Sequence, residues 1–241
     1  MRRNKHVAKH ENSLILYSVV KIPDNKSAKT SFPFFCSINQ NDYKMNNFWD
    51  ERFGNEEYAY GTEPNHYFKE QIEKLKPGKI LFPAEGEGRN AVYAATKSWN
   101  VTAFDPSIEG KRKAEQLAGK NNVSIQYLIN SYELVDFPLE SFDCIVLIFA
   151  HMNPAKRKEY HKKLISFLKN GGVLILEGFS KNQIKKNTGG PRDIEMLFSE
   201  QELKSDFSSF SKIEITETDT ILNEGPFHQG TASVIRVFGV K

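Results

Sequence analysis

From residue 45 onward, hydrophobic and polar positions fall into alternating blocks that predict strands and helices in turn. Five short apolar runs are expected to be buried strands, at 80–83, 101–104, 124–129, 144–150 and 173–179. Helices are expected before and between them, at 65–75, 90–97, 108–120 and 154–168, the last with Pro154 in its first turn. Strands that alternate with helices indicate a parallel sheet built from βαβ units.

The rhythm changes after residue 198. Ser199, followed three residues later by Glu202, has the spacing of a capping box and predicts a helix over 199–207. Two β-rich runs follow, at 213–222 and 232–240, and their short connection favours antiparallel pairing. The predicted fold is therefore α/β: a Rossmann-like, mostly parallel seven-stranded sheet with helices on both faces and a C-terminal antiparallel strand pair.

The first 44 residues differ in character. They begin with a basic stretch and contain one short apolar run, at 14–20. We predict a poorly ordered N-terminal extension over 1–44, with Met45 as a candidate natural start, and one domain over 45–241. A basic targeting leader is the alternative interpretation.

Composition narrows the function classes. A formal net charge of +3 over 241 residues does not predict a nucleic-acid partner, because phosphate binders concentrate basic charge on one face. The two cysteines, Cys36 and Cys144, have no metal-ligand or disulfide-framework spacing, so no metal site is predicted. The sequence has no apolar run of membrane-spanning length, and we expect a cytoplasmic monomer or homodimer with no membrane partner.

The most informative segment is the turn that follows the strand at 80–83. It reads Glu85-Gly86-Glu87-Gly88, and a predicted helix begins directly after it. Glycines in such a turn let the backbone pass close to a ligand, and a helix N-terminus offers free N–H groups. A tight turn that holds no ligand is the alternative. Asp105 ends the next strand, where a carboxylate can accept both hydrogen bonds of a ribose diol.

The acidity of this turn discriminates between cofactors. A dinucleotide site usually carries a third glycine, and Ala91 stands at that place here. Glu85 and Glu87 would repel a pyrophosphate, whereas an acidic turn suits the sulfonium and aminoacyl groups of S-adenosylmethionine. The turn therefore predicts S-adenosylmethionine as the cofactor, ahead of NAD.

Several segments resemble the class I S-adenosylmethionine-dependent methyltransferases, and within them the tellurite-resistance and thiopurine-methyltransferase-like branch. These segments lie at 58–64, 85–91, 142–143, 169–172, 189–191 and 227–230, and the resemblance runs from about Phe48 to the C-terminus. It implies a set of cofactor-binding residues: Trp49, Tyr60, Gly61, Ala84, Glu85, Gly86, Gly88, Arg89, Asn90, Asp105, Pro106, Ser131, Tyr132 and Phe149.

The sequence departs from that family at two places. Phe82 stands where such enzymes usually end the first strand in an acid, and Glu85 is expected to compensate from nearby. Asn130-Ser131-Tyr132 stands where an acid often contacts the adenine amino group, a contact that backbone groups can also supply.

On the acceptor side, methyl transfer from a sulfonium needs orientation and desolvation, and a base only if the acceptor must lose a proton. His151, after the strand at 144–150, and His228, between the last two strands, are the candidate catalytic residues; ordinary loop histidines are the alternative. Aromatic faces at Trp49, Tyr58 and Tyr60 suit a cationic donor, or simply pack. The long basic loop at 180–198 suggests a mobile loop that attracts an anionic acceptor, or a solvated charged surface.

The preferred hypothesis is an S-adenosylmethionine-dependent methyltransferase acting on a small molecule, with a thiol, a chalcogen oxyanion or a similar nucleophile as acceptor. A methyltransferase acting on a macromolecule is one alternative. A catalytically inactive S-adenosylmethionine-binding module is another, favoured only by the missing acid at Phe82. An NAD-dependent oxidoreductase ranks last.

Overall fold

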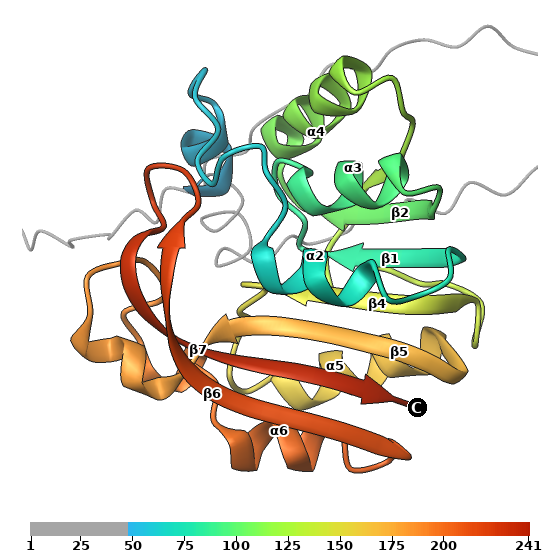
Figure 1. Cartoon of the computed structure of the whole chain (residues 1–241), viewed down its shortest axis with the longest axis vertical. Helices are drawn as coiled ribbons and strands as arrows, with labels where there is room; N and C mark the ends of the chain where they lie inside the picture. The colour runs from blue at the N-terminus through green and yellow to red at the C-terminus, as the bar shows by residue number, and fades with distance from the viewer. Residues whose placement is uncertain (1–47) are drawn as a thin grey trace, which may run out of the picture. The chain divides into compact units, whose positions relative to one another are not determined.

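The computed structural model describes residues 48–241, which build a seven-stranded sheet in the order β3-β2-β1-β4-β5-β7-β6 (Figure 1). The strands are β1 (Lys79–Pro83), β2 (Asn100–Asp105), β3 (Gln126–Ile129), β4 (Phe142–Ile148), β5 (Leu168–Phe179), β6 (Lys212–Asn223) and β7 (Gln229–Val240). The helices are one at 48–53, α2 (His66–Ile72), α3 (Arg89–Thr96), α4 (Ile108–Lys120), α5 (Arg157–Phe167) and α6 (Glu200–Asp206). The predicted extension at 1–44 lies outside the described residues.

The predicted sheet plan is confirmed. Strands β1 to β5 pair in parallel, and β7 runs antiparallel to both β5 and β6. The chain order reverses beside β1, whose two neighbours are β2 and β4. In open α/β sheets, ligands bind at the carboxyl ends of the strands where the order reverses. In residues 48–241, no helix combines the length and the apolar character that crossing a membrane requires.

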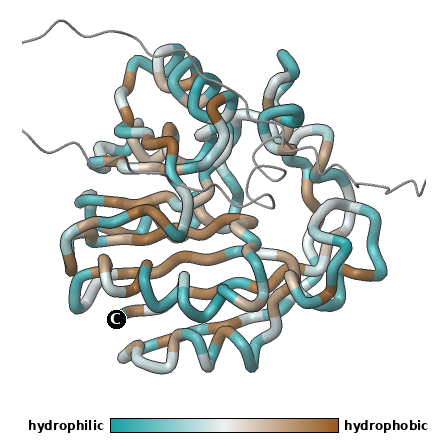
Figure 2. Tube along the Cα trace, turned by 180° about the vertical axis from the view of Figure 1, so that it is seen from behind, coloured by the Kyte–Doolittle hydropathy of each residue, from teal (hydrophilic) through white to brown (hydrophobic). Residues whose placement is uncertain are grey.

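Alternating side chains of the central strands fill two separate cores. On one face, Ile80 and Phe82 of β1 pack with Phe68 of α2 and with alanines of α3 and α4. On the other face, Leu81 packs with residues of α5 and α6. Figure 2 shows the hydrophobic residues concentrated along the central strands, as expected for a sheet buried on both faces.

Some boundaries differ from those that the sequence predicts. α5 begins at Arg157, so Pro154 lies in the preceding turn and not in the first turn of the helix. β4 ends before Phe149, because Phe149 has a left-handed φ of 51°. β5 already begins at Leu168. The capping box of α6 is confirmed, with Ser199 and Glu202 bonded reciprocally.

A single glycine lets α3 approach α4. Gly88 precedes α3 with a φ of 86°, and a Cβ built on it would lie 2.5 Å from the Cβ of Ala114 in α4. Both the conformation and the close packing exclude a side chain here.

We expect Gly88→Ala to destabilise the fold by about 2 to 4 kcal/mol, because it adds left-handed strain to overpacking. Gly119→Ala is the matched control, since Gly119 lies in α4 and a Cβ added to it would meet no neighbouring atom within 4 Å. That control should gain about 0.5 to 1 kcal/mol from helix propensity. Urea unfolding of both variants checks this, and equal stability of the two would contradict it.

Candidate functional site

The turn between β1 and α3 is held by its own first glutamate. Ala84, Gly86 and Gly88 all have left-handed φ values, of 51°, 60° and 86°. Glu85 folds back so that its Oε1 accepts the backbone N–H groups of Asn90 at 2.9 Å and Ala91 at 2.7 Å. Burial raises the pKa of Glu85 to about 7. Glu85 thus caps α3 and keeps this end of the turn polar.

The glycines of the turn leave room for protein atoms. A Cβ on Gly86 would lie 3.0 Å from the ring of Phe53, just as one on Gly88 would meet Ala114. That the backbone of these glycines also passes close to a ligand stays a prediction. What the glycines supply is the left-handed backbone and the packing of helix 48–53 and α4 against the turn.

Glu87 was expected to lie beside the ligand and repel a pyrophosphate, but its carboxylate is instead paired within the protein. Its Oε1 lies 2.8 Å from the Lys113 ammonium, both side chains being at most 3% exposed, and its Oε2 accepts the N–H of Tyr60. Lys113 also donates to the carbonyl of Glu57. The buried pair therefore fixes the segment at 57–60 beside the turn, and Glu85 is left as the acid of the turn itself.

Asp105 lies at the carboxyl end of β2, as predicted. Its two oxygens accept the N–H of Gly86 at 3.1 Å and the N–H of Ser107 at 2.9 Å. Burial, opposed by these N–H groups, raises its pKa to about 6. Each oxygen keeps further lone pairs, so Asp105 ties the turn to the β2–α4 loop and retains the capacity to accept from a ribose diol.

Of the predicted cofactor-binding residues near Asp105, some lie beside it and one turns away from it. Ser131 stays close, because the N–H of the preceding Asn130 donates to the Asp105 carbonyl. Tyr132 turns into the core, stacked on Tyr160, and its buried hydroxyl has no partner within the described chain. The prediction of Tyr132 as a cofactor contact is thus not supported. Pro106 follows Asp105 directly and is half-buried.

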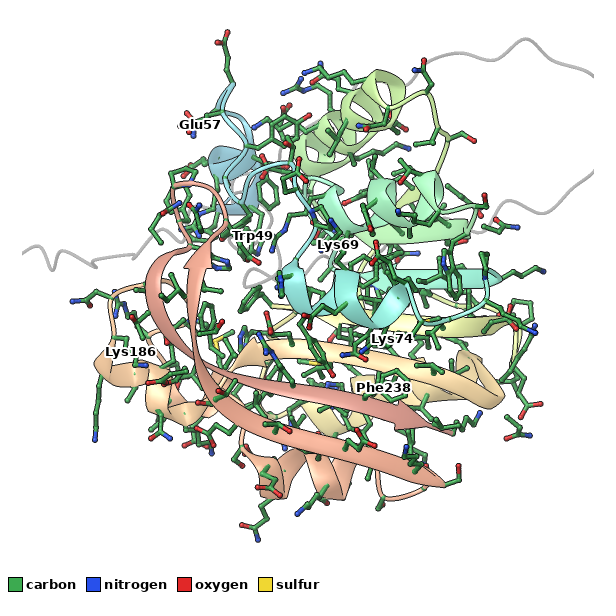
Figure 3. The ribbon with its side chains drawn as sticks, viewed as in Figure 1. Trp49, Glu57, Lys69, Lys74, Lys186 and Phe238 are labelled. Carbon is green, nitrogen blue, oxygen red and sulfur yellow. The ribbon has the colours of Figure 1, made fainter. Side chains whose placement is uncertain are left out.

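Aromatic side chains of helix 48–53 cover the turn and reach the β6–β7 connection. Trp49 stacks on Phe53, with ring centroids 5.3 Å apart. Arg52 lies over the rings of Trp49 and Phe227, and it donates to the Tyr60 hydroxyl at 2.8 Å. Figure 3 shows Trp49 of this helix near the tip of the β6–β7 hairpin. Gly61, with a φ of 70°, packs on the backbone of Gly225 at the same place.

His228 is brought into this cluster from the β6–β7 connection. Its ring lies 4.5 Å from those of Tyr60 and Phe149, and 5.2 Å from that of Phe179. Nδ1 lies 3.4 Å from Glu224 Oε2, which places the hydrogen on Nδ1. Nε2 has no partner among residues 48–241. Burial lowers the pKa of His228 even though Glu224 opposes this, so the neutral base form is favoured.

A polar network that sequence reasoning missed holds His228 in place. Asn65 donates from Nδ2 to Glu177 at 2.6 Å and to Glu224 at 2.9 Å, and its backbone N–H donates to Asn90 Oδ1. Arg89 Nη2 donates to Glu224 Oε2 at 2.8 Å. Against the effect of burial, Arg89 and His228 lower the pKa of Glu224 to about 2. Glu224 is therefore a fixed anion that links the turn, the segment at 60–65 and His228.

His151 has a structural role, contrary to the prediction. Its Nδ1 bonds to the Met196 carbonyl at 2.8 Å, and its Nε2 accepts the N–H of Phe179 at 3.0 Å. The ring is stacked between Phe179 and Phe198. With both ring nitrogens bonded to the backbone, His151 has no free nitrogen for an acceptor.

Two lysines of the loop at 180–198 pair with carboxylates outside the loop. Lys181 pairs with Glu202, Lys186 pairs with Asp219, and Arg192 donates to the Lys186 carbonyl. Figure 3 places Lys186 at the edge of the molecule, beside β6. The glycines also pack: a Cβ on Gly189 would lie 2.7 Å from His228, and one on Gly190 would lie 2.7 Å from Phe179. The loop thus covers His228. Lys185 is exposed, and attraction of an anionic acceptor by this loop stays a prediction.

A cavity of about 720 Å³ opens next to Glu224. It lies between the segment at 60–66 and the ends of β6 and β7 that adjoin their connection. Glu177 and Arg236 form part of its wall. Its lining includes no residue of the turn at 84–88. Tyr60 and Glu224 line this cavity, and Glu224 also accepts the hydrogen bond from Arg89 at the start of α3.

The residues present fit S-adenosylmethionine. The turn is preformed, Asp105 stands at the end of the neighbouring strand, and the exposed side chains of Ile108 and Ile129 offer apolar surface near it. Arg89 contributes the most direct sign of a missing ligand, because its Nη1 is buried without an acceptor in the described part of the chain. A buried donor of a charged group is rarely left unsatisfied.

Comparison with known proteins agrees with this interpretation. A family model described as a methyltransferase domain matches residues 80–172, while no curated protein sequence matches. Among solved structures, TehB from Haemophilus influenzae superimposes with a TM-score of 0.61 at 17% identity, over 81% of this chain and 66% of that chain. A SAM-dependent methyltransferase from Aquifex aeolicus gives 0.53 at 17% identity, over 71% of this chain and 88% of that chain.

A third solved structure, described for the conversion of a disulfide bond into a thioacetal group during echinomycin biosynthesis, gives a TM-score of 0.65. Its identity is 14%, over 82% of this chain and 91% of that chain. At these identities the likeness concerns the fold, which is that of class I S-adenosylmethionine-dependent methyltransferases. The family match and the fold support a methyltransferase and imply S-adenosylmethionine as its cofactor.

The environment of His151 predicts a loss of stability in acid. Burial lowers the pKa of this imidazole from 6.5 to about 4, so the unfolded chain binds more protons between these values. Its contribution to folding is complete above pH 6.5 and falls by about 2 to 3 kcal/mol by pH 4.5. We expect His151→Gln, measured by urea unfolding at pH 7.5 and 4.5, to lose less stability on acidification than the wild type. Parallel losses in both proteins would refute this role.

Proposed function

We propose that this protein transfers the methyl group of S-adenosylmethionine to a small-molecule nucleophile, with His228 as the residue that orients or deprotonates the acceptor. The observation that carries the proposal is the state of the His228 ring. Nδ1 is held by Glu224, Nε2 has no partner in the described chain, and the ring is enclosed by Tyr60, Phe149 and Phe179. A neutral imidazole with one free nitrogen is equipped to accept a proton.

The cofactor is proposed to lie along the turn at 84–88, with its ribose on Asp105 and its adenine between Asp105 and Ser131. When bound, it supplies an electrophilic methyl group for in-line displacement. Trp49, Phe53 and Tyr60 exclude water from the turn side. The acceptor would enter through the cavity beside Tyr60 and Glu224 and meet the methyl group directly, with the His228 ring, 4.5 Å from that of Tyr60, beside it.

The acceptor class proposed is a thiol, a chalcogen oxyanion or a similar compact nucleophile. The segments shared with the tellurite-resistance and thiopurine-methyltransferase-like branch support it. So does the fold likeness to TehB and to the protein described for converting a disulfide bond into a thioacetal. A thiol needs only deprotonation at one atom, which a single free imidazole nitrogen provides.

The assay measures S-adenosylhomocysteine release from S-adenosylmethionine with thiols, selenite and tellurite, set against amines and phenols of similar size. Turnover confined to the sulfur and chalcogen acceptors supports the proposal. Binding of S-adenosylmethionine without turnover on any of them favours the inactive binding module. Turnover only with protein or nucleic-acid fractions favours a macromolecular acceptor.

With a thiol acceptor, we expect His228→Asn to lower kcat by about 100-fold, because it removes the proton acceptor. The affinity for S-adenosylmethionine, measured by calorimetry, should stay within about twofold. The wild-type rate should fall as pH drops below the ordinary histidine value of 6.5, since burial lowers the pKa of His228, and the variant should lack this limb. An unchanged kcat and pH profile would exclude His228 from the reaction.

A further inference from the structure

One guanidinium nitrogen of Arg89 has no hydrogen-bond acceptor in the described part of the chain. Its side chain is 8% exposed, and Nη2 donates to Glu224. Nη1 is fully enclosed and has no acceptor among residues 48–241. Because a guanidinium stays charged, an enclosed nitrogen of this kind calls for an anionic oxygen at that position.

The groups around Arg89 define what such a ligand must look like. Arg89 acts on the pKa values of Glu85 in the turn, of Glu224 and His228 in the β6–β7 connection, and of Tyr60. Glu224 already has its own partners, whereas Glu85 caps α3 through Oε1 and also bonds to the Asn90 side chain. An unpartnered guanidinium nitrogen and a carboxylate thus both lie at the start of α3, where Arg89 also lowers the pKa of Glu85 against the effect of burial.

That pair of groups matches the two charges of an α-amino acid. We propose that Arg89 Nη1 binds the carboxylate of the aminoacyl end of S-adenosylmethionine, with the Glu85 carboxylate beside the ammonium group. The assignment rests on the proposed function, since it names the part of the cofactor that meets these residues. Glu85 thereby replaces the acid that Phe82 lacks at the end of β1.

The position of Arg89 gives this contact a second consequence. One face of the guanidinium meets the cofactor, and the other holds Glu224, which holds His228. A single side chain therefore connects the cofactor carboxylate with the proposed acceptor base. Arg89 is a binding residue toward the cofactor and a positioning residue toward His228.

The test is calorimetry on the full chain with S-adenosylmethionine and with its decarboxylated form, which keeps the ammonium group and lacks only the carboxylate. The variants are Glu224→Gln and the double variant Arg89→Gln/Glu224→Gln, so that removal of Arg89 does not leave a buried unpaired carboxylate. From the single to the double variant, affinity for S-adenosylmethionine should fall by roughly tenfold to a hundredfold. Affinity for the decarboxylated form should stay within about twofold.

Arg112→Gln is the matched control, because it removes the same charge from an exposed position on α4. It should change neither affinity. Equal losses for both ligands in the double variant would mean that Arg89 only maintains the fold, and no loss for either would mean that Nη1 meets water; each result overturns the proposal. Selenite binding that requires Arg89 and persists with S-adenosylmethionine bound would instead assign the position to an acceptor oxyanion.

Failure of this proposal is distinguishable from failure of the proposed function. If the wild type binds S-adenosylmethionine and the decarboxylated form equally well, only the carboxylate contact is wrong. If the wild type binds neither, the cofactor assignment fails as well.

Discussion

The rest of the site depends on a left-handed turn that two carboxylates hold closed. Glu85 takes the first free N–H groups of α3, and Asp105 takes the N–H of Gly86 from the neighbouring strand. Because these donors are satisfied by the protein, the turn has its shape before any ligand arrives. Its conformation in turn directs Arg89 toward Glu224 and sets α3 against α4 through Gly88. Preorganisation of this kind lowers the cost of binding.

A second set of polar contacts joins segments that lie far apart in the chain. Asn65 reaches Glu224 across 159 positions and Glu177 across 112. Phe227 donates its N–H to the Ala59 carbonyl, and Gly225 packs on Gly61. The turn is thus covered by polar and aromatic residues of three segments: helix 48–53, the segment at 57–65 and the β6–β7 connection. The catalytic candidate His228 is positioned by these segments together with Phe149 and Phe179 at the ends of β4 and β5.

Features set by local sequence could be predicted well. α4 spans Ile108–Lys120 as predicted, because Ser107 caps it and its apolar period is regular. The parallel part of the sheet follows from the alternation of strands and helices, and its antiparallel end follows from one short connection. β4 was placed too far along the chain because the left-handed φ of Phe149 leaves no mark in an apolar run.

The roles of charged and polar side chains could not be predicted in the same way, since they depend on partners brought in by the fold. Glu87 looks like a free acid of the turn until Lys113 neutralises it. His151 and His228 occupy similar places in the sequence pattern, yet the backbone of Met196 and Phe179 occupies both nitrogens of the first and neither of the second. Asn65 and Glu224 carry no motif that distinguishes them from surface residues.

The central claim is that the turn between β1 and α3, together with Asp105, binds S-adenosylmethionine. Calorimetry of the purified full chain with S-adenosylmethionine, S-adenosylhomocysteine and NAD tests it most directly, with Asp105→Asn as the variant. We expect binding of both adenosyl compounds, none of NAD, and a loss of about tenfold or more in the variant, because a ribose loses its charged acceptor. Binding of NAD alone, or equal binding of the adenosyl compounds by wild type and variant, would contradict it.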